Sequence, residues 1–429
     1  MVLLLLISAL VDFSAGLIIS KGYKNLGLYL SVFFNLGILC YFKYSYFLTS
    51  NFTNLFESFG VTIDYSSKFI DVALPIGISF FTFQTMSYTI DVYRGKVIAN
   101  NNFIDFACYV TLFPQLIAGP IVRYSEIEAE LQHKNINLES LYNGCKRFII
   151  GLSKKMLIAN NCAFFADAAF SLPNNELSML VAWLGIICYA LQIYFDFSGY
   201  SDMAIGLGLM FGFTFPENFN YPYISKSVKD FWRRWHITLS NWFKDYLYIP
   251  LGGNRNGATK TYLNLVIVFG LTGLWHGASW TFLIWGLWHG LFLIIERLGL
   301  DKVLKKNHSS LSYIYTLLVV LIGWVFFRSD TLSQAIGFIK KLFDFKTATN
   351  YGFFNFYLTK EVIIALIIGL FLATPIYKHI LEYFNKKSEQ SLSYKSYIVL
   401  NLLSLLLLFW TCYYYIATNA YNPFIYFKF

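Results

Sequence analysis

Apolar residues occur along this chain in blocks of about 20, separated by short polar segments. A helix of about 20 residues crosses the roughly 30 Å of hydrocarbon in a bilayer, so each block predicts a membrane-spanning helix. The pattern indicates an all-α, polytopic membrane protein with about 11 transmembrane helices. The predicted spans are about 1–20, 25–47, 70–92, 103–122, 144–168, 178–198, 201–215, 261–280, 281–297, 311–328, 361–377 and 396–416.

Some of these blocks do not fit a simple crossing. Pro75, Pro114 and Pro120 interrupt two spans, and the block at 201–215 is too short to cross. Irregular backbone at membrane depth is tolerated where protein encloses it, so we expect one or more re-entrant segments. The first block lacks a basic n-region and a small-residue cleavage site, which predicts a retained helix.

The chain shows no repeat, low-complexity tract or linker, so a single membrane domain over 1–429 is expected. The composition agrees, because 57% of the residues are hydrophobic and 13% are charged, against about 25% charged in soluble domains. Six scattered cysteines form no C-x-x-C motif and predict small core residues, without a metal site.

The net charge of +9 comes from basic loops between the apolar blocks. By the positive-inside rule these loops face the cytoplasm, and they also suit lipid headgroups; nothing in the pattern indicates nucleic acid. The amphipathic stretch FRSDTLSQAIGFIKKLFDF is expected on the outer surface, with Lys340–Lys346 external. The basic loops are Arg123–Lys155, Lys226–Lys260, Arg297–Lys306 and Lys378–Lys395.

Polar residues inside the predicted spans mark where function is expected. An ionisable group at the bilayer centre costs about 2.5–3.5 kcal/mol on insertion scales, so such groups usually face a cavity. The candidates are Gln84, Tyr88, Asp196, His276 and His289.

His276 and His289 stand in two similar Trp-His-Gly triplets in the stretch GLWHGASWTFLIWGLWHG. At about 100° and 1.5 Å per residue, they would lie more than about 120° and about 20 Å apart on one helix. A turn near Ser279–Thr281 would place them on different helices, so a direct histidine pair is not expected. Each could also be a core histidine bonded to a carbonyl.

Glycines four residues apart flank each of these triplets, and this spacing predicts close helix packing. The glycines are Gly273 and Gly277, then Gly286 and Gly290.

The stretch FWRRWHITLSNWFKDYLYIP interleaves aromatic and basic residues. One interpretation is a plain helix in the cytoplasmic interface. The more specific interpretation is the entrance of a donor site, called the mouth below, that binds an anionic acyl donor such as a nucleotide thioester. The arginine of GGNR would bind a phosphate of this donor in a bidentate manner. The chain contains no P-loop lysine motif and no G-x-S-x-G elbow. Neither a P-loop NTPase nor an α/β-hydrolase is therefore indicated. The mouth residues are Trp232, Arg233, Arg234, Trp235 and Arg255.

Several long motifs together resemble the membrane-bound O-acyltransferase family, in particular its bacterial branch that O-acetylates alginate and peptidoglycan. The resemblance covers nearly the whole chain. The relatives that D-alanylate teichoic acids are similar around RWH but usually lack an IPLGGNR-type continuation. The motifs are PIGISFFTFQTMSYTIDVYRG, LFPQLIAGPIVRY, QIYFDFSGYSDMAIGLGLMFGFTFPENFNYPY, FWRRWHITLSNWFKDYLYIPLGGNR and GLWHGASWTFLIWGLWHG.

In addition to the re-entrant and interfacial helices expected from the pattern, the resemblance implies a ring of tilted helices around a central tunnel through the membrane. It assigns the family's invariant histidine to His276, in GLWHG, as the catalytic residue. It assigns a second functional histidine to His236, in RWHITLS, and leaves His289 in a supporting place.

Acyl transfer from a thioester to a hydroxyl needs a base, and imidazole titrates near neutral pH. It also needs hydrogen-bond donors for the developing oxyanion. Asp196 is expected either to orient a histidine or to pair with a membrane arginine. No metal and no bound cofactor is expected. The candidate donors are Gln84, Tyr88, Ser198, Tyr200 and Trp275.

The predicted function is therefore acetyl transfer from a cytoplasmic thioester, acetyl-CoA, for O-acetylation of an extracytoplasmic polysaccharide. The resemblance implies a multi-pass protein of the bacterial inner membrane, with an extracytoplasmic esterase-like acetyltransferase as partner. Two alternatives stay open, a teichoic acid D-alanyl transferase and a transporter of a polysaccharide or lipid-linked substrate. A transporter would suit intramembrane carboxylates and broken helices, but no inverted repeat is visible.

Overall fold

The computed structural model describes residues 2–61, 74–306, 309–346, 351–380 and 394–418, and these residues form helices and no strand. The all-α prediction is confirmed for them. The elements are α1 (Val2–Ser20), α2 (Lys24–Leu39), η1 (Cys40–Tyr44), α3 (Ser45–Ser58), α4 (Ile78–Tyr93), α5 (Phe103–Thr111), α6 (Phe113–Leu116), α7 (Tyr124–Gln132), α8 (Leu138–Ser153), η2 (Lys154–Ala159), α9 (Asn160–Ser171), α10 (Met179–Met210), η3 (Pro222–Ile224), α11 (Val228–Arg234), α12 (Ile237–Phe243), η4 (Lys244–Tyr248), α13 (Ala258–His276), α14 (Trp280–Ile295), η5 (Glu296–Leu300), α15 (Asp301–Lys306), α16 (Ser309–Arg328), α17 (Leu332–Leu342), α18 (Tyr351–Tyr357), α19 (Lys360–Leu372) and α21 (Tyr394–Ala417).

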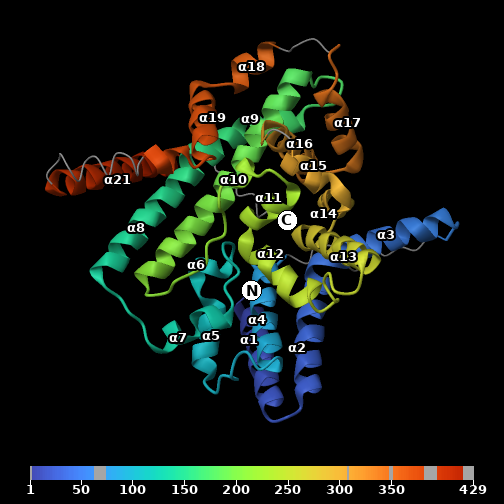
Figure 1. The fold of residues 1–429 in the computed structure, drawn as a ribbon, viewed down its shortest axis with the longest axis vertical. Helices are drawn as coiled ribbons and strands as arrows, with labels where there is room; N and C mark the ends of the chain where they lie inside the picture. The colour runs from blue at the N-terminus through green and yellow to red at the C-terminus, as the bar shows by residue number, and fades with distance from the viewer. Residues whose placement is uncertain (1, 62–73, 307–308, 347–350, 381–393, 419–429) are drawn as a thin grey trace.

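The N-terminal helices α1, α2 and α4 pack together at one end of the molecule, with α5 against α1 (Figure 1). A buried carboxylate, Asp12, lies inside this bundle. It accepts hydrogen bonds from Asn35 Nδ2 (2.8 Å), from Thr89 Oγ1 (3.0 Å) and from the Ser31 hydroxyl. A buried carboxylate is costly unless it is hydrogen-bonded, so these contacts from α2 and α4 hold the three helices in register.

The predicted helix breaks at the prolines are confirmed. Helix α4 begins three residues after Pro75, and α5 ends at Thr111. Pro114 lies in the single turn α6, and Pro120 lies in the irregular segment that leads to α7. Proline lacks a backbone N–H and constrains the preceding residue, so a long helix does not form over this segment.

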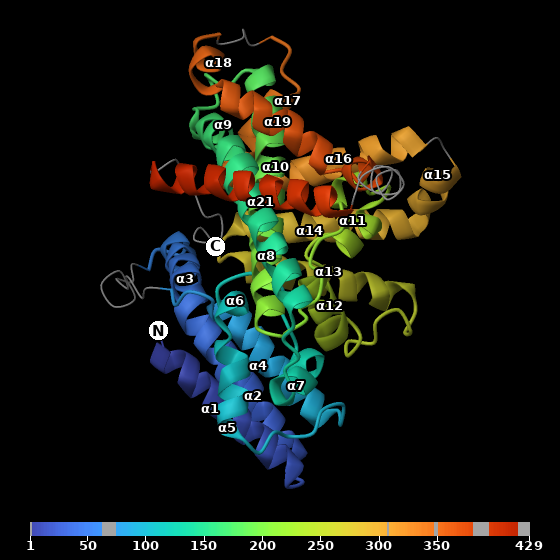
Figure 2. The same ribbon diagram turned by 90° about the vertical axis from the view of Figure 1, so that its left-hand side faces the viewer.

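Helix α10 is the longest element and crosses the centre of the fold, with α8 and α9 packed along it (Figures 1 and 2). The prediction of separate blocks at 178–198 and 201–215 is wrong, because one helix, Met179–Met210, includes residues of both. Gly199 does not break it, because glycine is tolerated where helices meet closely. A Cβ on Gly199 would lie 2.7 Å from the carbonyl oxygen of Gly151 on α8.

The hairpin α13–α14 is confirmed, with its turn between His276 and Trp280. The predicted close packing is confirmed as well. A Cβ on Gly286 would lie 2.1 Å from the carbonyl oxygen of Phe269, and one on Gly273 would lie 2.2 Å from that of Phe282. The glycines therefore bring the two backbones into contact.

Six helices of the described residues are long and apolar enough to cross a membrane, or seven if the bent pair α18 and α19 forms one span. This supports a multi-pass membrane protein, while the count of about 11 stays a prediction. The basic segment Lys378–Lys395 lies mostly outside the described residues. Helix α17 is amphipathic as predicted; its buried side is formed by Ala335, Phe338 and Leu342.

Candidate active site

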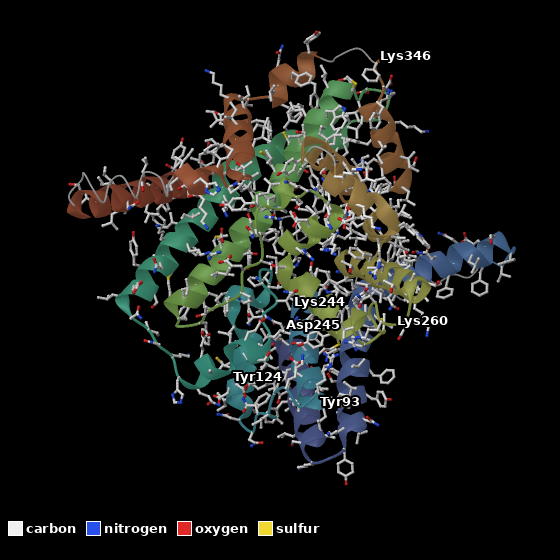
Figure 3. All side chains as sticks on the ribbon, viewed as in Figure 1. Tyr93, Tyr124, Lys244, Asp245, Lys260 and Lys346 are labelled. Atoms are coloured by element: carbon white, nitrogen blue, oxygen red, sulfur yellow. The ribbon has the colours of Figure 1, made fainter. Side chains whose placement is uncertain are left out.

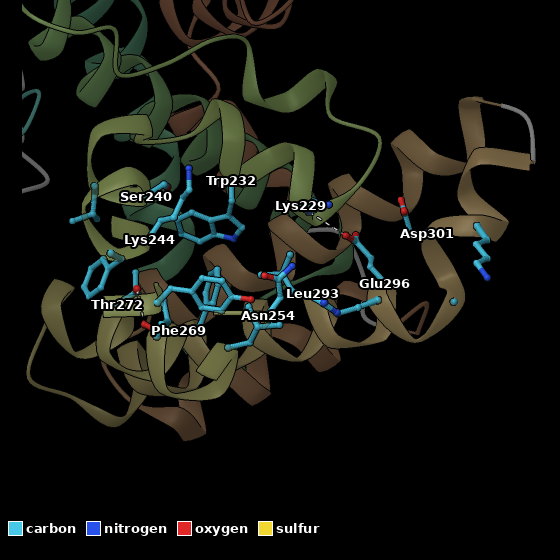
Figure 4. Close-up of a pocket in the computed structure, with 18 residues that line it drawn as sticks. Lys229, Trp232, Ser240, Lys244, Asn254, Phe269, Thr272, Leu293, Glu296 and Asp301 are labelled. Carbon is cyan, nitrogen blue, oxygen red and sulfur yellow. Dashed lines mark hydrogen bonds between the residues drawn. The ribbon is translucent and has the colours of Figure 1, made fainter. Parts of the chain in front are cut away.

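A cavity of about 530 Å³ lies between the short helices α11 and α12 and the hairpin α13–α14 (Figure 4). Four exposed cationic side chains line its outer part, Lys229, Lys244, Arg297 and Lys302. Buried residues line its inner part, and Thr272 of α13 is among them with 4% exposure. The cavity therefore leads from a solvated, positively charged mouth into the protein. Its aromatic lining consists of Trp232, Phe243, Tyr248 and Phe269.

The two carboxylates at the mouth are engaged by the protein itself. Glu296 accepts hydrogen bonds from the backbone N–H groups of Val228 (2.6 Å) and Lys229 (3.1 Å), at the start of α11. Asp301 pairs with Lys305 at 2.7 Å. The mouth thus keeps a net positive character that suits an anionic ligand.

Thr272 connects the cavity to His276. Each residue advances a helix by about 1.5 Å and 100°, so Thr272 and His276 lie on one face of α13, about 6 Å apart along its axis. His276 is the last residue of this helix. The inner part of the cavity therefore approaches His276 to within about one helical turn.

Aromatic rings enclose His276 on several sides. Ring centroids of Trp275 and Trp285 lie 5.0 Å from that of His276, and the centroid of Phe327 lies 5.2 Å away. Among the described residues, neither ring nitrogen of His276 has a hydrogen-bond partner. Buried polar atoms are usually paired, so an imidazole without a protein partner in this position is available to a substrate hydroxyl.

His236 has a strained backbone and a fixed tautomer. Its φ of 41° lies in the left-handed region, which costs a non-glycine residue about 1–3 kcal/mol. Its Nδ1 lies 3.0 Å from Oδ1 of Asn218, and this same oxygen accepts from the N–H of Thr238 (3.3 Å). Because that oxygen is an acceptor, Nδ1 of His236 must carry the hydrogen. The lone pair on Nε2 has no partner among the described residues.

His236 and His276 both contact Trp275. The centroids of His236 and Trp275 are 6.2 Å apart, and those of Trp275 and His276 are 5.0 Å apart. The structure thus brings together the two histidines that the sequence separates by 40 positions (276 − 236). Trp275, predicted as an oxyanion donor, lies between their rings, but its indole N–H points to the carbonyl oxygen of Ser79 at 3.4 Å.

His289 is fully buried on α14, between Trp232 and Trp285, with ring centroids 5.3 Å from each. Among the described residues, no ring contact or hydrogen bond joins His289 to His276, in agreement with the prediction. Trp285 contacts both rings, so the two histidines share a neighbour. A Cβ on Gly323 would lie 2.9 Å from Nε2 of His289, which shows how tightly α16 covers this ring.

Comparison with known proteins is consistent with this arrangement. The model of the membrane-bound O-acyltransferase family matches residues 35–329, which include the cavity and all three histidines. The chain belongs to the membrane-bound O-acyltransferase family.

Relatives in this family carry several substrate names. The chain is 47% identical over 323 residues to the "Probable alginate O-acetylase AlgI" of Pseudomonas aeruginosa, covering 75% of this chain and 61% of that protein. It is 40% identical over 351 residues to the peptidoglycan O-acetyltransferase of Helicobacter pylori, covering 75% and 65%. A teichoic acid D-alanyltransferase of Bacillus subtilis is 31% identical over 222 residues, covering 49% and 55%. The match thus spans less than two thirds of the length of these relatives.

The remaining predicted residues on α10 and α4 have different surroundings. Asp196 pairs with Lys155 at 2.5 Å. Ser198 is buried and its hydroxyl has no partner among the described residues. Tyr200 lies against Gly119. Both side-chain amide atoms of Gln84 are buried without a partner in the described part of the chain.

Tyr88 belongs to the N-terminal bundle. Its hydroxyl accepts a hydrogen bond from the backbone N–H of Asn100 at 3.0 Å. Its ring packs in a hydrophobic cluster separate from the one that holds Trp275 and Trp285. The structure therefore does not bring Tyr88 to the histidines.

The predicted arginines of the mouth do not line the cavity. Arg233 is exposed, and Arg234 pairs with Asp230 at 3.1 Å. Arg255 lies in the turn after η4, next to Asn254, which does line the cavity. Of the predicted aromatic residues, Trp232 lines it, while Trp235 packs against Trp324 with ring centroids 4.8 Å apart.

The sequence pattern did not show which cations line the mouth. Lys244 belongs to the quoted aromatic and basic stretch and Lys229 lies two residues before it, but the pattern did not separate them from Arg233 and Arg234, which do not line the cavity. Arg297 and Lys302 lie in a loop read only as a topology signal. Asn218 was also missed, because its contact with His236 depends on the irregular backbone between α10 and α11.

Proposed function

We propose that this protein transfers an acetyl group from acetyl-CoA, bound in the cavity between α11 and α14, to a hydroxyl group of an extracytoplasmic polysaccharide or of a partner protein that acetylates it. One observation carries the proposal most directly. The cavity leads from a cationic mouth to Thr272, one helical turn from His276. The family membership and the O-acetylating relatives support the same reaction class.

The mouth suits the nucleotide end of the donor. Lys229, Lys244, Arg297 and Lys302 offer ammonium and guanidinium groups to phosphates, with long-range attraction that is screened by salt. The aromatic lining further in offers apolar surface for the pantetheine arm. The thioester then points toward the face of α13 that carries Thr272 and His276.

His276 acts as the general base in this proposal. The acceptor oxygen attacks the thioester carbonyl while an imidazole nitrogen of His276 takes the hydroxyl proton. The tetrahedral intermediate collapses, the C–S bond breaks, and the CoA thiolate takes the proton from the imidazolium. The products are an acetyl ester and CoA with its thiol, so protons and electrons balance.

His236 assists at the same centre. With Nδ1–H held by Asn218, its Nε2 lone pair can accept a hydrogen bond from the acceptor hydroxyl or help to pass on its proton. His289 is a packing neighbour in this account, because aromatic rings separate it from the cavity face of α13.

The proposed setting is the bacterial inner membrane, with the mouth toward the cytoplasm and the acceptor arriving from outside. An extracytoplasmic esterase-like acetyltransferase would receive the acetyl group on its own hydroxyl and complete O-acetylation. A D-alanyl transferase with a carrier-protein donor is the second candidate, favoured only by the more distant D-alanyltransferase relatives. The relatives with O-acetylating names are more similar to this chain.

Purified protein in sealed vesicles tests the proposal. Acetyl-CoA with a labelled acetyl group is supplied on the side of the mouth, and a polysaccharide acceptor with its partner protein on the other. Labelled ester on the acceptor with equimolar free CoA thiol is the expected result. Translocation of label without ester formation, or transfer only from a D-alanyl carrier protein, would replace the proposal.

A further inference from the structure

The end of the helix that carries His276 is held by a lysine from the N-terminal part of the chain. Lys43 lies in the π-helical turn η1 between α2 and α3. Its Nζ donates to the carbonyl oxygens of Trp275 (2.6 Å) and His276 (3.1 Å) and to the hydroxyl of Ser79 (3.2 Å). Two segments far apart in sequence thus meet at the last residue of α13.

The neighbouring residue completes this arrangement. The last four carbonyl groups of a helix have no partner in their own helix and need other donors. The Tyr44 hydroxyl donates to the carbonyl oxygen of Leu274 at 2.6 Å, and the N–H of Gly277 donates to the carbonyl oxygen of Gly273 at 3.4 Å. Together with Lys43, these donors satisfy all four carbonyls from 273 to 276. Many helices end with a local glycine cap, whereas α13 is capped by side chains from a distant segment.

The charge and geometry of Lys43 fit a positioning role. An ammonium group has three N–H donors, and all three are used by the contacts above. The C-terminal end of a helix carries negative partial charge, which favours a cation there. No carboxylate contacts Lys43 in the part of the chain that the structure describes. The ammonium therefore serves the end of α13, and no donor remains for a substrate.

We propose that Lys43, assisted by Tyr44, is a positioning residue that fixes the backbone of His276 so that its imidazole meets the thioester carbonyl and the acceptor hydroxyl. This inference rests on the proposed acetyl transfer with His276 as base. The geometry of the site then depends on two segments, since η1 holds the end of α13 from outside the cavity. A misplacement of about 1 Å can cost about 10²-fold in rate, so a loose helix end would be felt in catalysis.

The test compares Lys43→Met, Lys43→Arg and Tyr44→Phe with the wild-type protein. Lys43→Met keeps the length of the side chain without its charge, and it should lower kcat about 10–100-fold while the KM for acetyl-CoA stays within about twofold. Lys43→Arg keeps a cationic donor and should recover most of the lost kcat. Tyr44→Phe removes one hydrogen bond and should have a smaller effect in the same direction.

A matched control is Lys154→Met. Lys154, the first residue of η2, forms an ion pair with Asp202 of α10 at 2.6 Å. Its loss should leave kcat per folded protein unchanged. Folded yield and the gel-filtration profile are compared for every variant.

Hydrogen exchange of the peptide that covers 273–279 gives a readout that needs no activity. Lys43→Met should speed exchange there and leave α14 unchanged, whether or not acetyl transfer is the reaction. If Lys43→Met speeds exchange but the wild-type protein transfers no acetyl group, the proposed function is wrong and the capping role of Lys43 stands. Unchanged exchange, or a folded Lys43→Met with wild-type kcat, would overturn the positioning role itself.

Discussion

Nδ1 of His236 lies 3.0 Å from Oδ1 of Asn218, and this contact decides which ring nitrogen carries hydrogen. The orientation of the Asn218 amide is set independently, because its nitrogen donates to the carbonyl of Gly119 (3.3 Å) and to the hydroxyl of Ser201 (3.1 Å). Asn218 thus acts on the second histidine of the site as an orienting group. The lone pair of Nε2 is left for the reaction.

Replacing Asn218 tests this relationship. Asn218→Leu removes the acceptor for Nδ1–H and should lower kcat about 10–100-fold, since outer groups that orient a functional histidine typically have effects of this size. Asn218→Asp keeps an acceptor oxygen and should retain more activity. Acetyl transfer per folded protein is the measurement, with Asn161→Leu as control, because the Asn161 amide donates to the carbonyl of Leu157, one turn earlier, and to no other group that the structure describes. Equal activity of Asn218→Leu and the control would contradict the account.

The close packing of the hairpin gives a prediction about stability. A Cβ on Gly286 would meet the carbonyl of Phe269 at 2.1 Å, so Gly286→Ala should destabilise the protein by at least about 1 kcal/mol and lower its melting temperature in detergent. Gly270→Ala on the same hairpin is the matched control. Its added Cβ would find neighbours only at 3.6 and 3.7 Å, an ordinary contact. Equal melting temperatures for the two variants would show that α13 and α14 are further apart than described.

Much of the fold follows from the apolar pattern. The hairpin α13–α14, α16 and α21 were predicted within a few residues, because each is a single apolar block bounded by polar segments. The break at 198–201 was placed wrongly. Gly199 weakens an isolated helix, and its close packing against Gly151 on α8 explains why α10 continues through it. Such tertiary compensation is not visible in one sequence.

The candidate site was predictable at its motifs and less so at its partners. His276 stood out because ionisable residues are rare in apolar sequence, whereas His236 was singled out by the family resemblance of RWHITLS. Their approach through Trp275, and the contacts of His236 with Asn218 and of His276 with Lys43, depend on tertiary structure. Likewise, the helical periodicity of the basic stretch did not show which of its cations face the cavity.

The cationic mouth gives a prediction about the donor. The double variant Lys244→Ala/Arg297→Ala should raise the KM for acetyl-CoA about tenfold with kcat within about twofold, because these groups bind ground state and transition state alike. The effect should shrink at higher ionic strength, where exposed charges are screened. Steady-state kinetics at two salt concentrations is the measurement. Lys260→Ala serves as control, since Lys260 is basic but does not line the cavity. A fall in kcat at constant KM would show that Lys244 and Arg297 do not bind the donor.

Sidedness is a separate prediction. Lys244 and Lys260 are expected in the cytoplasm and Lys340–Lys346 outside, as the basic loops indicate. Figure 3 shows Lys346 well away from Lys244 and Lys260 in the plane of the view. In a cysteine-free background, a cysteine at position 341 should react with an impermeant maleimide in intact cells, and one at 244 should react only after lysis. The reverse pattern would place the mouth outside and exclude a cytoplasmic donor.

The most direct measurement of the central claim compares His276→Gln with His289→Gln in acetyl ester formed per folded protein. Glutamine keeps most of the volume and hydrogen bonding of histidine but cannot take a proton, so His276→Gln should lose at least about 10²-fold. His289→Gln should keep substantial activity, because aromatic rings separate His289 from His276. Folded yield and gel-filtration profile control for misfolding. A well-folded His276→Gln that transfers acetyl at the wild-type rate would contradict the assignment of His276 as the base.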